Sequence, residues 1–332
     1  MKILVTGGAG FMGSHLVDYL INEGHDVTII DNLFGGYNEN INKSANFIQG
    51  DLTNRKDCEN AVKGQDIVYH LAAHAAEGQS VFCPIFNTNV NYIGFLELVR
   101  AVINEGIGKF VFTSSMAVYG KKPKLPMRED MLREPEDPYG IAKAACERIL
   151  EIYRSVFGLD YVIIRPHNVY GPRQNLCDPY RNVIGIFMNR IMKGKPPIIY
   201  GDGIQTRAFT YIDDCTPYIA KAGFTKKAYG EIINIGNETP TTIKDLADIV
   251  LKAMDSKIKP EYAPARPQEV KHAYCSSEKA RKLLGYETST PIEVGVKKMA
   301  EWAKSIGPKT CKYWDRFEIT RNAPDVWINK KI

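Results

Sequence analysis

The chain has 332 residues, enough for one large domain or two fused domains with a substantial buried core. Its 44% hydrophobic and 24% charged residues are ordinary for a globular protein, and its net charge of +5 forms no basic stripe, so we expect no nucleic-acid partner. No apolar run is long enough for a signal peptide or a membrane span, so we expect a cytoplasmic protein without a membrane partner.

The seven cysteines form no CxxC pair, which argues against a zinc site or a disulfide framework and fits a reducing, cytoplasmic setting. His70, His74 and His167 lie on separate segments without the spacing of metal ligands. We therefore expect no metal.

Short β-branched runs alternate with longer helical patterns along the first half of the chain. The predicted strands cover residues 2–6, 26–30, 46–49, 66–70, 109–113 and 161–165. Helices are predicted from Phe11, near Asn54, across 81–105 and across 139–157. This alternation predicts an α/β fold of the Rossmann type, with a doubly wound parallel sheet of at least six strands and helices on both faces.

Beyond Arg165 the pattern changes, because segments 165–174 and 193–197 are rich in residues that favour loops. Runs at 209–212 and 231–236 resemble strands again. We assign 1–165 and 208–236 to a Rossmann domain, and 166–207 and 237–332 to a smaller, discontinuous α/β lobe. The aromatic residues of its C-terminal tail (307–332) either pack on the body or cover a cleft, and packing is favoured; they are Trp314, Phe317 and Trp327.

Three glycines join the first strand to the first helix. Gly7 permits a tight turn, Gly10 allows the backbone to approach a pyrophosphate, and Gly13 allows close helix packing. The start of the helix adds N–H donors and a positive dipole. A tight turn without a ligand is the alternative, which the flanking strand and helix disfavour. The loop therefore predicts a dinucleotide-binding site.

Two acidic residues follow the second and third strands. Asp31, eighteen residues after Gly13, is placed to accept hydrogen bonds from ribose hydroxyls and would repel a 2′-phosphate, which favours NAD over NADP. The alternative is a cap formed by Asp31 and Asn32. Asp51 is placed at the adenine edge, with an Asx-turn as its alternative.

Tyr139 and Lys143 are four residues apart, so they share one face of the predicted helix. A lysine ammonium near a phenol lowers the pKa of the phenol, which would let Tyr139 act as a general base. Ser115 follows a strand that ends at the ligand-binding edge of the sheet, and would hydrogen-bond the reacting oxygen. The alternative is an ordinary helix start with a surface lysine.

These motifs resemble those of the extended short-chain dehydrogenase/reductases: TGGAGFMG at 6–13, HLAA at 70–73, TSSMAVYG at 113–120, YGIAK at 139–143 and RPHNVYGPRQ at 165–174. The chain is most similar to nucleotide-sugar 4-epimerases, especially UDP-glucose and UDP-N-acetylglucosamine 4-epimerases. The resemblance implies bound NAD, a UDP-sugar between the lobes, and a homodimer formed through helices around 90–104 and 139–157. It also implies an NAD site lined, besides the three glycines, by Phe11, Met12, Asp31, Asn32, Asp51, Leu52, Leu71, Ala72, Ala73, His74, Asn89, Tyr139 and Lys143.

Within this resemblance, the residues after Ser115 distinguish the reactions. Related dehydratases use an Asp-Glu pair there, decarboxylases a Glu and a 3,5-epimerase a Cys, whereas this chain has Met116 and Ala117. Since Ala117 cannot transfer protons, we predict C4 epimerisation through a transient 4-keto sugar, without net oxidation.

The resemblance also implies a substrate site. Arg207 and Arg266 match phosphate-binding arginines, with structural ion pairs as the alternative. Ala273 stands where enzymes restricted to unacetylated sugars have a tyrosine, so we predict UDP-GlcNAc and UDP-GalNAc as substrates, alongside UDP-glucose and UDP-galactose; a merely packed alanine is the alternative. The remaining implied contacts are Ser115 for the sugar, Asn168 for the phosphate or sugar, and Asn182, Val183 and Tyr200 for the uridine.

Two rival functions remain. Related 4-epimerases that act on UDP-glucuronate have an arginine in the loop after HLAA, whereas this chain has Glu77, which would repel a carboxylate. A non-catalytic NAD-sensing regulator can share the fold, but such proteins commonly lose the tyrosine and lysine that this chain retains as Tyr139 and Lys143. An enzyme is therefore favoured.

Overall fold

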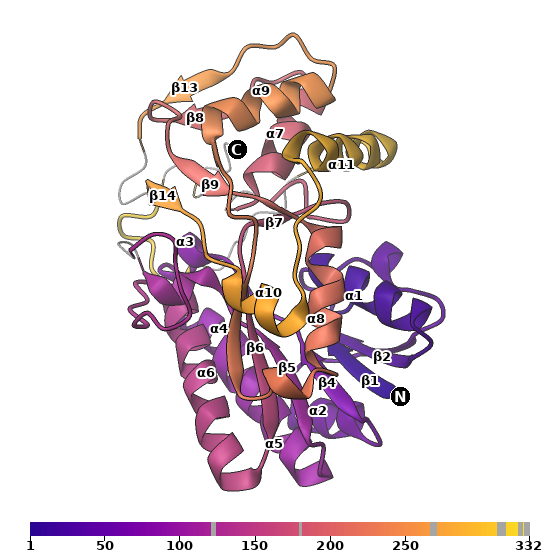
Figure 1. Cartoon of the computed structure of the whole chain (residues 1–332). Helices are drawn as coiled ribbons and strands as arrows, with labels where there is room; N and C mark the ends of the chain where they lie inside the picture. Colours follow the sequence, from indigo (N-terminus) through magenta and orange to yellow (C-terminus); the bar gives the residue numbers. More distant parts are fainter. Residues whose placement is uncertain (121–123, 179–180, 266–270, 311–316, 325–327, 329–332) are drawn as a thin grey trace.

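Seven parallel strands form the central sheet, in the order β11-β6-β5-β4-β1-β2-β3. The computed structural model describes residues 1–120, 124–178, 181–265, 271–310, 317–324 and 328 (Figure 1). The order reverses at β1 and β4, as in a Rossmann fold, so the predicted doubly wound parallel sheet is confirmed. The strands are β1 (Lys2–Thr6), β2 (Asp26–Asp31), β3 (Asn46–Gln49), β4 (Ile67–His70), β5 (Lys109–Thr113), β6 (Asp160–Pro166) and β11 (Glu231–Ile235).

Helices cover both faces of this sheet. Alternate side chains of each strand face opposite sides, so Ile3 and Val5 join one buried cluster while Leu4 joins the other. One face packs against α1 (Phe11–Asn22), α8 (Thr216–Ala222) and α10 (Glu278–Leu284), and the other against α2 (Arg55–Val62), α5 (Gly94–Glu105) and α6 (Pro138–Phe157). We call the sheet with these helices the sheet lobe.

The helix expected across 81–105 is interrupted. A short helix α3 (Glu77–Ser80) comes first, and α4 (Pro84–Thr88) then continues through a π-helical segment, Asn89–Ile93, into α5. Pro84 explains the break, because proline has no N–H to donate and is tolerated only in the first turn of a helix. The prediction of one helix is therefore wrong before residue 84.

A smaller lobe packs above the sheet lobe in Figure 1. Its apolar core is formed by α7 (Val183–Met192), α9 (Ile243–Ala253) and α11 (Ile292–Ile306). We call this part the small lobe. Its short strands are β8 (Ile198–Tyr200) with β13 (Glu261–Ala263), and β9 (Thr206–Ala208) with β12 (Pro240–Thr242) and β14 (His272–Ala273).

The two strands predicted after Arg165 belong to different sheets. The run at 231–236 becomes β11 in the main sheet. The run at 209–212 forms only β10 (Thr210–Tyr211), which pairs with β7 (Val169–Tyr170) in a separate two-stranded sheet. This segment therefore lies outside the main sheet.

Cysteine usage differs from expectation at one position. In the described part of the chain five buried cysteines have free thiols, but Cys177 is disulfide-bonded. Spacing along the chain did not predict this bond because a disulfide depends on proximity in space. None of the described helices has the length and apolar character needed to span a membrane.

Candidate NAD and substrate site

The glycine loop forms a tight, backbone-lined cradle before α1. Gly7 has φ +73° and its carbonyl accepts the N–H of Gly10 at 3.0 Å. A side chain at Gly13 would overlap that carbonyl oxygen, and one at Gly7 would lie 2.7 Å from the backbone nitrogen of Ala72. No side chain caps α1, and its first turn has no acidic residue. The loop therefore fits the pyrophosphate of a dinucleotide, whose charge would satisfy the helix start.

Asp31 holds this cradle in shape. One carboxylate oxygen accepts the N–H of Ala9 at 3.0 Å, and the other accepts the N–H of Leu33 at 2.8 Å. These two hydrogen bonds lower the pKa of the Asp31 carboxyl, but burial has the larger effect and raises the pKa above its ordinary value. The turn-capping alternative is thus realised in the Leu33 contact, while each oxygen retains a second lone pair for a ribose hydroxyl.

Asp51 is engaged in a local turn. Its carboxylate accepts the Thr53 N–H at 2.8 Å, the Thr53 hydroxyl at 2.7 Å and the Asn32 amide at 2.9 Å. Burial raises the pKa of this carboxyl, but the hydrogen bonds from Asn32 and Thr53 outweigh it, so the pKa lies below its ordinary value. The Asx-turn that we considered as the alternative is therefore present.

The loop after β4 places His74 against the sheet lobe. Its ring packs edge-on against Phe86 at 5.1 Å, and its Nδ1 contacts the Asn87 amide at 3.2 Å. Burial, with the charge of Arg181, lowers the pKa of His74 to about 4, so the ring is neutral at pH 7. The preceding residues Leu71, Ala72 and Ala73 are half-buried along the same loop.

Tyr139, Ser115 and Lys143 converge beyond the end of β5. All three are buried, and the Ser115 hydroxyl hydrogen-bonds the phenol of Tyr139. The Lys143 ammonium donates to the carbonyl of Thr113 at 2.8 Å and lies 5.8 Å from the centre of the Tyr139 ring. The triad predicted from the sequence is thus brought together at the edge of the sheet where ligands of this fold bind.

The pKa values of this cluster differ from the simple expectation. Burial raises the pKa of Tyr139 well above its ordinary value, against the Ser115 hydrogen bond and the charge of Arg181, which lower it. Burial also lowers the pKa of Lys143 to about 8. We expected the lysine to dominate the pKa of the phenol, but desolvation has the larger effect in the protein alone.

The start of α6 is fixed by residues that the sequence analysis did not single out. Asp137 accepts the N–H of Gly140 at 2.9 Å as the N-cap, and the Ser80 hydroxyl contacts both Asp137 at 3.3 Å and the N–H of Tyr139 at 3.3 Å. An Asp before a Pro at a helix start is a recognisable cap, so Asp137 could have been found from the sequence. No local pattern indicates Ser80.

A buried ion pair lies behind this cluster. Glu147 of α6 accepts two hydrogen bonds from Arg165 of β6, at 2.9 and 2.6 Å, and one from the Ser114 hydroxyl at 2.5 Å. Neither Glu147 nor Arg165 has any exposed side-chain surface. The pair connects α6, which presents Tyr139, to the strand ends beside Ser115.

The predicted substrate residues lie mainly in the small lobe. Arg207 of β9 pairs in register with Ala273 of β14, so these two positions are direct neighbours. Ala273 is only 1% exposed, and it packs in a small apolar cluster near Met116. Asn168 has φ +42°, and its amide donates to the carbonyl of Ala208 at 3.1 Å. Arg266 lies outside the described residues.

The uridine contacts implied by the resemblance lie on two elements of the small lobe. Asn182, with φ +68°, precedes α7, and Val183 is the first residue of that helix. Tyr200 ends β8, where its carbonyl accepts the Gln205 amide at 2.9 Å.

Arg181 and Glu77 are two charged residues whose proximity the sequence analysis did not predict. Arg181, before α7, donates to Asp178 at 2.6 Å and to the carbonyl of Ala75 in the sheet lobe at 2.7 Å. Its charge also acts on Tyr139 and Glu77. Glu77 is exposed, and the charges of Asp137, Arg207 and Arg181 all act on its carboxyl.

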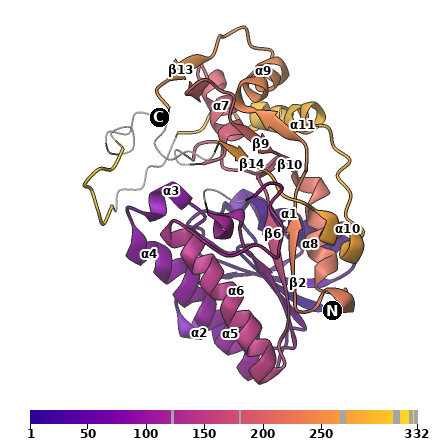
Figure 2. The same cartoon turned by 60° about the vertical axis from the view of Figure 1, so that its left-hand side comes forward.

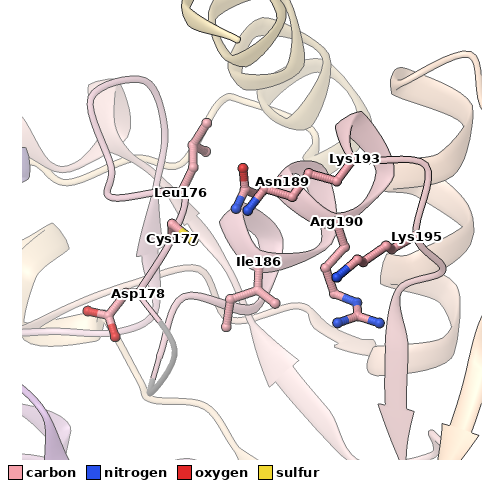
Figure 3. Close-up of a pocket in the computed structure, with 8 residues that line it drawn as sticks. All are labelled: Leu176, Cys177, Asp178, Ile186, Asn189, Arg190, Lys193 and Lys195. Atoms are coloured by element: carbon pink, nitrogen blue, oxygen red, sulfur yellow. The ribbon is translucent and has the colours of Figure 1, made fainter. Parts of the chain in front are cut away.

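No cluster of three or more metal-ligating side chains occurs among the described residues. His70 instead contacts the Thr6 hydroxyl at 2.7 Å within the core. A separate, small hollow of about 20 Å³ lies beside α7 and contains none of the predicted site residues (Figure 3). It is lined by Leu176, Cys177, Asp178, Ile186, Asn189, Arg190, Lys193 and Lys195.

The Rossmann sheet, the glycine cradle and the Tyr139 cluster together define the class of protein as an NAD-dependent enzyme of the short-chain dehydrogenase/reductase type. Residues 3–236 match the sequence profile of the NAD dependent epimerase/dehydratase family, and the chain belongs to this family. The predicted family and the predicted cofactor, NAD, are therefore confirmed.

Similar proteins extend over almost the whole chain. A UDP-glucuronate 4-epimerase of Thermodesulfobacterium geofontis is 34% identical over 91% of this chain and 95% of its own length. The UDP-N-acetylglucosamine 4-epimerase of Methanobrevibacter ruminantium, solved with UDP-N-acetylmuramic acid, superposes with a TM-score of 0.85 at 37% identity over 92% of this chain and 98% of its own. The UDP-glucose 4-epimerase of Thermus thermophilus, solved with NAD, has a TM-score of 0.85 at 33% identity over 91% and 98%.

Proposed function

We propose that this protein is a UDP-sugar 4-epimerase that interconverts UDP-GlcNAc and UDP-GalNAc through a transient 4-keto sugar, and that also acts on UDP-glucose and UDP-galactose. The observation that supports it most is the meeting of Tyr139, Ser115 and Lys143 at the end of β5, beside Ala117. The Ala117 carbonyl lies close to Gly140, next to Tyr139. By the sequence resemblance, relatives with other chemistries have acidic or thiol side chains at the position of Ala117.

The residues of the cluster have distinct roles in this proposal. Tyr139 takes the proton from the C4 hydroxyl, Ser115 hydrogen-bonds the same oxygen, and the Lys143 ammonium stabilises the phenolate. NAD, held by the glycine cradle, Asp31 and the loop from Leu71 to His74, would accept the C4 hydride and return it to the other face. Because the phenol is buried, the proton is transferred without competition from bulk water.

Ala273 supports the acetamido substrates. It lies beside Arg207, the described arginine proposed for the phosphates, and its side chain occupies less space there than a tyrosine would. Ala273→Tyr should abolish turnover of UDP-GlcNAc while sparing UDP-glucose. Equal loss of both activities would contradict the proposal, because overpacking of a buried position would then be the simpler cause.

UDP-glucuronate is a second candidate, favoured by one observation. The loop after β4 lacks an arginine, but Arg181 brings a guanidinium to the carbonyl of Ala75 in that same loop. Such a cation offsets Glu77 and suits a sugar carboxylate. If this candidate is correct, Arg181→Gln should lose turnover of UDP-glucuronate while turnover of UDP-glucose persists.

The deciding experiment incubates the purified protein separately with UDP-GlcNAc, UDP-glucose and UDP-glucuronate, without added NAD, and separates the C4 epimers by chromatography. We expect epimers of the first two. A Tyr139→Phe variant should lose at least about 100-fold in rate, because the general base is removed. Tyr153→Phe, the same change on the outer part of α6, is the matched control. Unchanged activity of Tyr139→Phe would refute the assigned base, and no turnover of any sugar would favour a regulator.

We also propose a homodimer formed through α6 and the π-helical segment before α5. Ile141, Ile152 and Val156 follow helical spacing along α6 and remain exposed, by 54%, 40% and 62%. Ile93 is exposed on the neighbouring segment, which contacts α6. An apolar stripe of this kind is typical of a helical interface between subunits, and a second copy would bury it symmetrically.

A further inference from the structure

The chain beyond α11 contacts the small lobe first. Lys309 donates its N–H to the side chain of Asn189 at 2.8 Å, and the Asn189 amide donates back to the carbonyl of Lys309 at 3.1 Å. Asn189 is buried on α7, at the hollow shown in Figure 3. This reciprocal pair fixes where the tail leaves the small lobe.

Eight residues later the tail lies on the sheet lobe, beside α3 and α4 (Figure 2). The N–H groups of Glu318 and Ile319 both donate to the carbonyl of Phe82, at 2.9 and 3.1 Å. The ring of Phe317 meets that of Phe82 edge-on at 6.3 Å. Lys309 and Glu318 therefore attach the tail to two different lobes.

Glu318 caps the N-terminus of α4, which has no cap from its own neighbouring residues. The helix begins at Pro84, which has no N–H, and Cys83 before it makes no side-chain capping bond. The next two N–H groups, of Ile85 and Phe86, each donate at 2.8 Å to one oxygen of the Glu318 carboxylate. A carboxylate at this position accepts hydrogen bonds from the helix start and complements the positive end of the helix.

The capped helix α4 packs against His74, which is proposed to line the NAD site. Phe86 packs its ring against His74 at 5.1 Å and Phe34 at 5.6 Å. Asn87, the next residue, donates to the carbonyl of His74 at 3.1 Å. A shift of α4 would therefore move His74, the residue proposed to lie near the nicotinamide ribose.

We propose that Glu318 is a positioning residue, which fixes α4 and through it His74, and so slows the dissociation of NAD. The inference rests on the proposed place of NAD but is independent of the sugar. Since loss of an N-cap costs about 1 kcal/mol, and 1.4 kcal/mol corresponds to a factor of ten, we expect NAD to exchange about fivefold faster without the carboxylate.

The test compares Glu318→Ala and Glu318→Gln with the wild-type holoenzyme. Exchange of bound NAD for added fluorescent etheno-NAD gives the dissociation rate, and hydrogen–deuterium exchange with mass spectrometry reports on residues 74–88. Glu318→Ala should raise both, and Glu318→Gln, which keeps one acceptor oxygen, should restore part of the effect. Glu301→Ala on α11, also an exposed glutamate, is the control.

Different outcomes separate the inference from the proposed function. Unchanged deuterium exchange of 74–88 in Glu318→Ala would overturn the cap. Faster deuterium exchange with an NAD exchange rate within twofold of the wild type would overturn the link to the cofactor. Wild-type protein that neither copurifies with NAD nor binds it would count against the proposed function, while the deuterium exchange of 74–88 would still decide whether Glu318 positions the segment.

Discussion

Removing the charge of Glu147 should destabilise the protein strongly without changing the shape of the side chain. In Glu147→Gln, the Arg165 guanidinium would lose a carboxylate that accepts two hydrogen bonds, at 2.9 and 2.6 Å, and would remain fully buried. Breaking a buried pair from one side costs about 3–5 kcal/mol, because the remaining charge has neither a counter-charge nor water around it. The surviving neighbour, Arg133, would add repulsion, since it also contacts Glu147 at 3.2 Å.

The expected shift in melting temperature follows from the size of the chain. Unfolding entropy of about 2.1 cal/mol/K per residue gives about 0.7 kcal/mol/K for 332 residues, so the loss corresponds to about 4–7 °C. Differential scanning calorimetry measures this directly.

An exposed ion pair provides the control for this experiment. In Asp255→Asn the partner Lys304 loses an exposed carboxylate at 2.7 Å, which should change stability by less than about 1 kcal/mol. The double variant Glu147→Leu with Arg165→Met should recover much of the loss, since neither charge remains. A Glu147→Gln variant that melts within about 1.5 °C of the wild type, as the control is expected to do, would refute the argument.

Three further variants test other parts of the structure. Gly13→Ala should lose bound NAD, measured by absorbance after denaturation, because its methyl group would overlap the Gly7 carbonyl; Gly108→Ala, where the methyl group meets nothing, should retain it. Lys143→Met should abolish turnover yet have a higher melting temperature than the wild type at pH 7. Burial lowers the pKa of Lys143 to about 8, so the wild type loses stability at any pH where the lysine is charged in both the folded and the unfolded protein. The difference in melting temperature should shrink as the pH rises from 8 towards 10.5, and a growing difference would contradict this sign. Val156→Lys should convert the proposed dimer to a monomer in light scattering, and an unchanged mass would place the interface elsewhere.

Features that depend on neighbouring residues along the chain can be predicted from the sequence alone. The parallel sheet follows from runs buried on both faces, such as Ile3 to Val5, alternating with helical patterns. The glycine cradle needs three positions within one turn, and the Tyr139 and Lys143 pair needs only helical spacing. These patterns are short enough for local geometry to fix them, which is why the fold and the cofactor could be predicted.

Contacts between groups far apart in the chain become visible only in the folded structure. Glu318 caps a helix 233 residues before it, and Arg181 reaches the carbonyl of Ala75, 106 residues away. Burial also decided the balance of pKa values at Tyr139, because desolvation depends on every element packed around the phenol. Residue spacing along the chain does not predict these contacts, because the paths of the loops between the lobes determine which side chains meet.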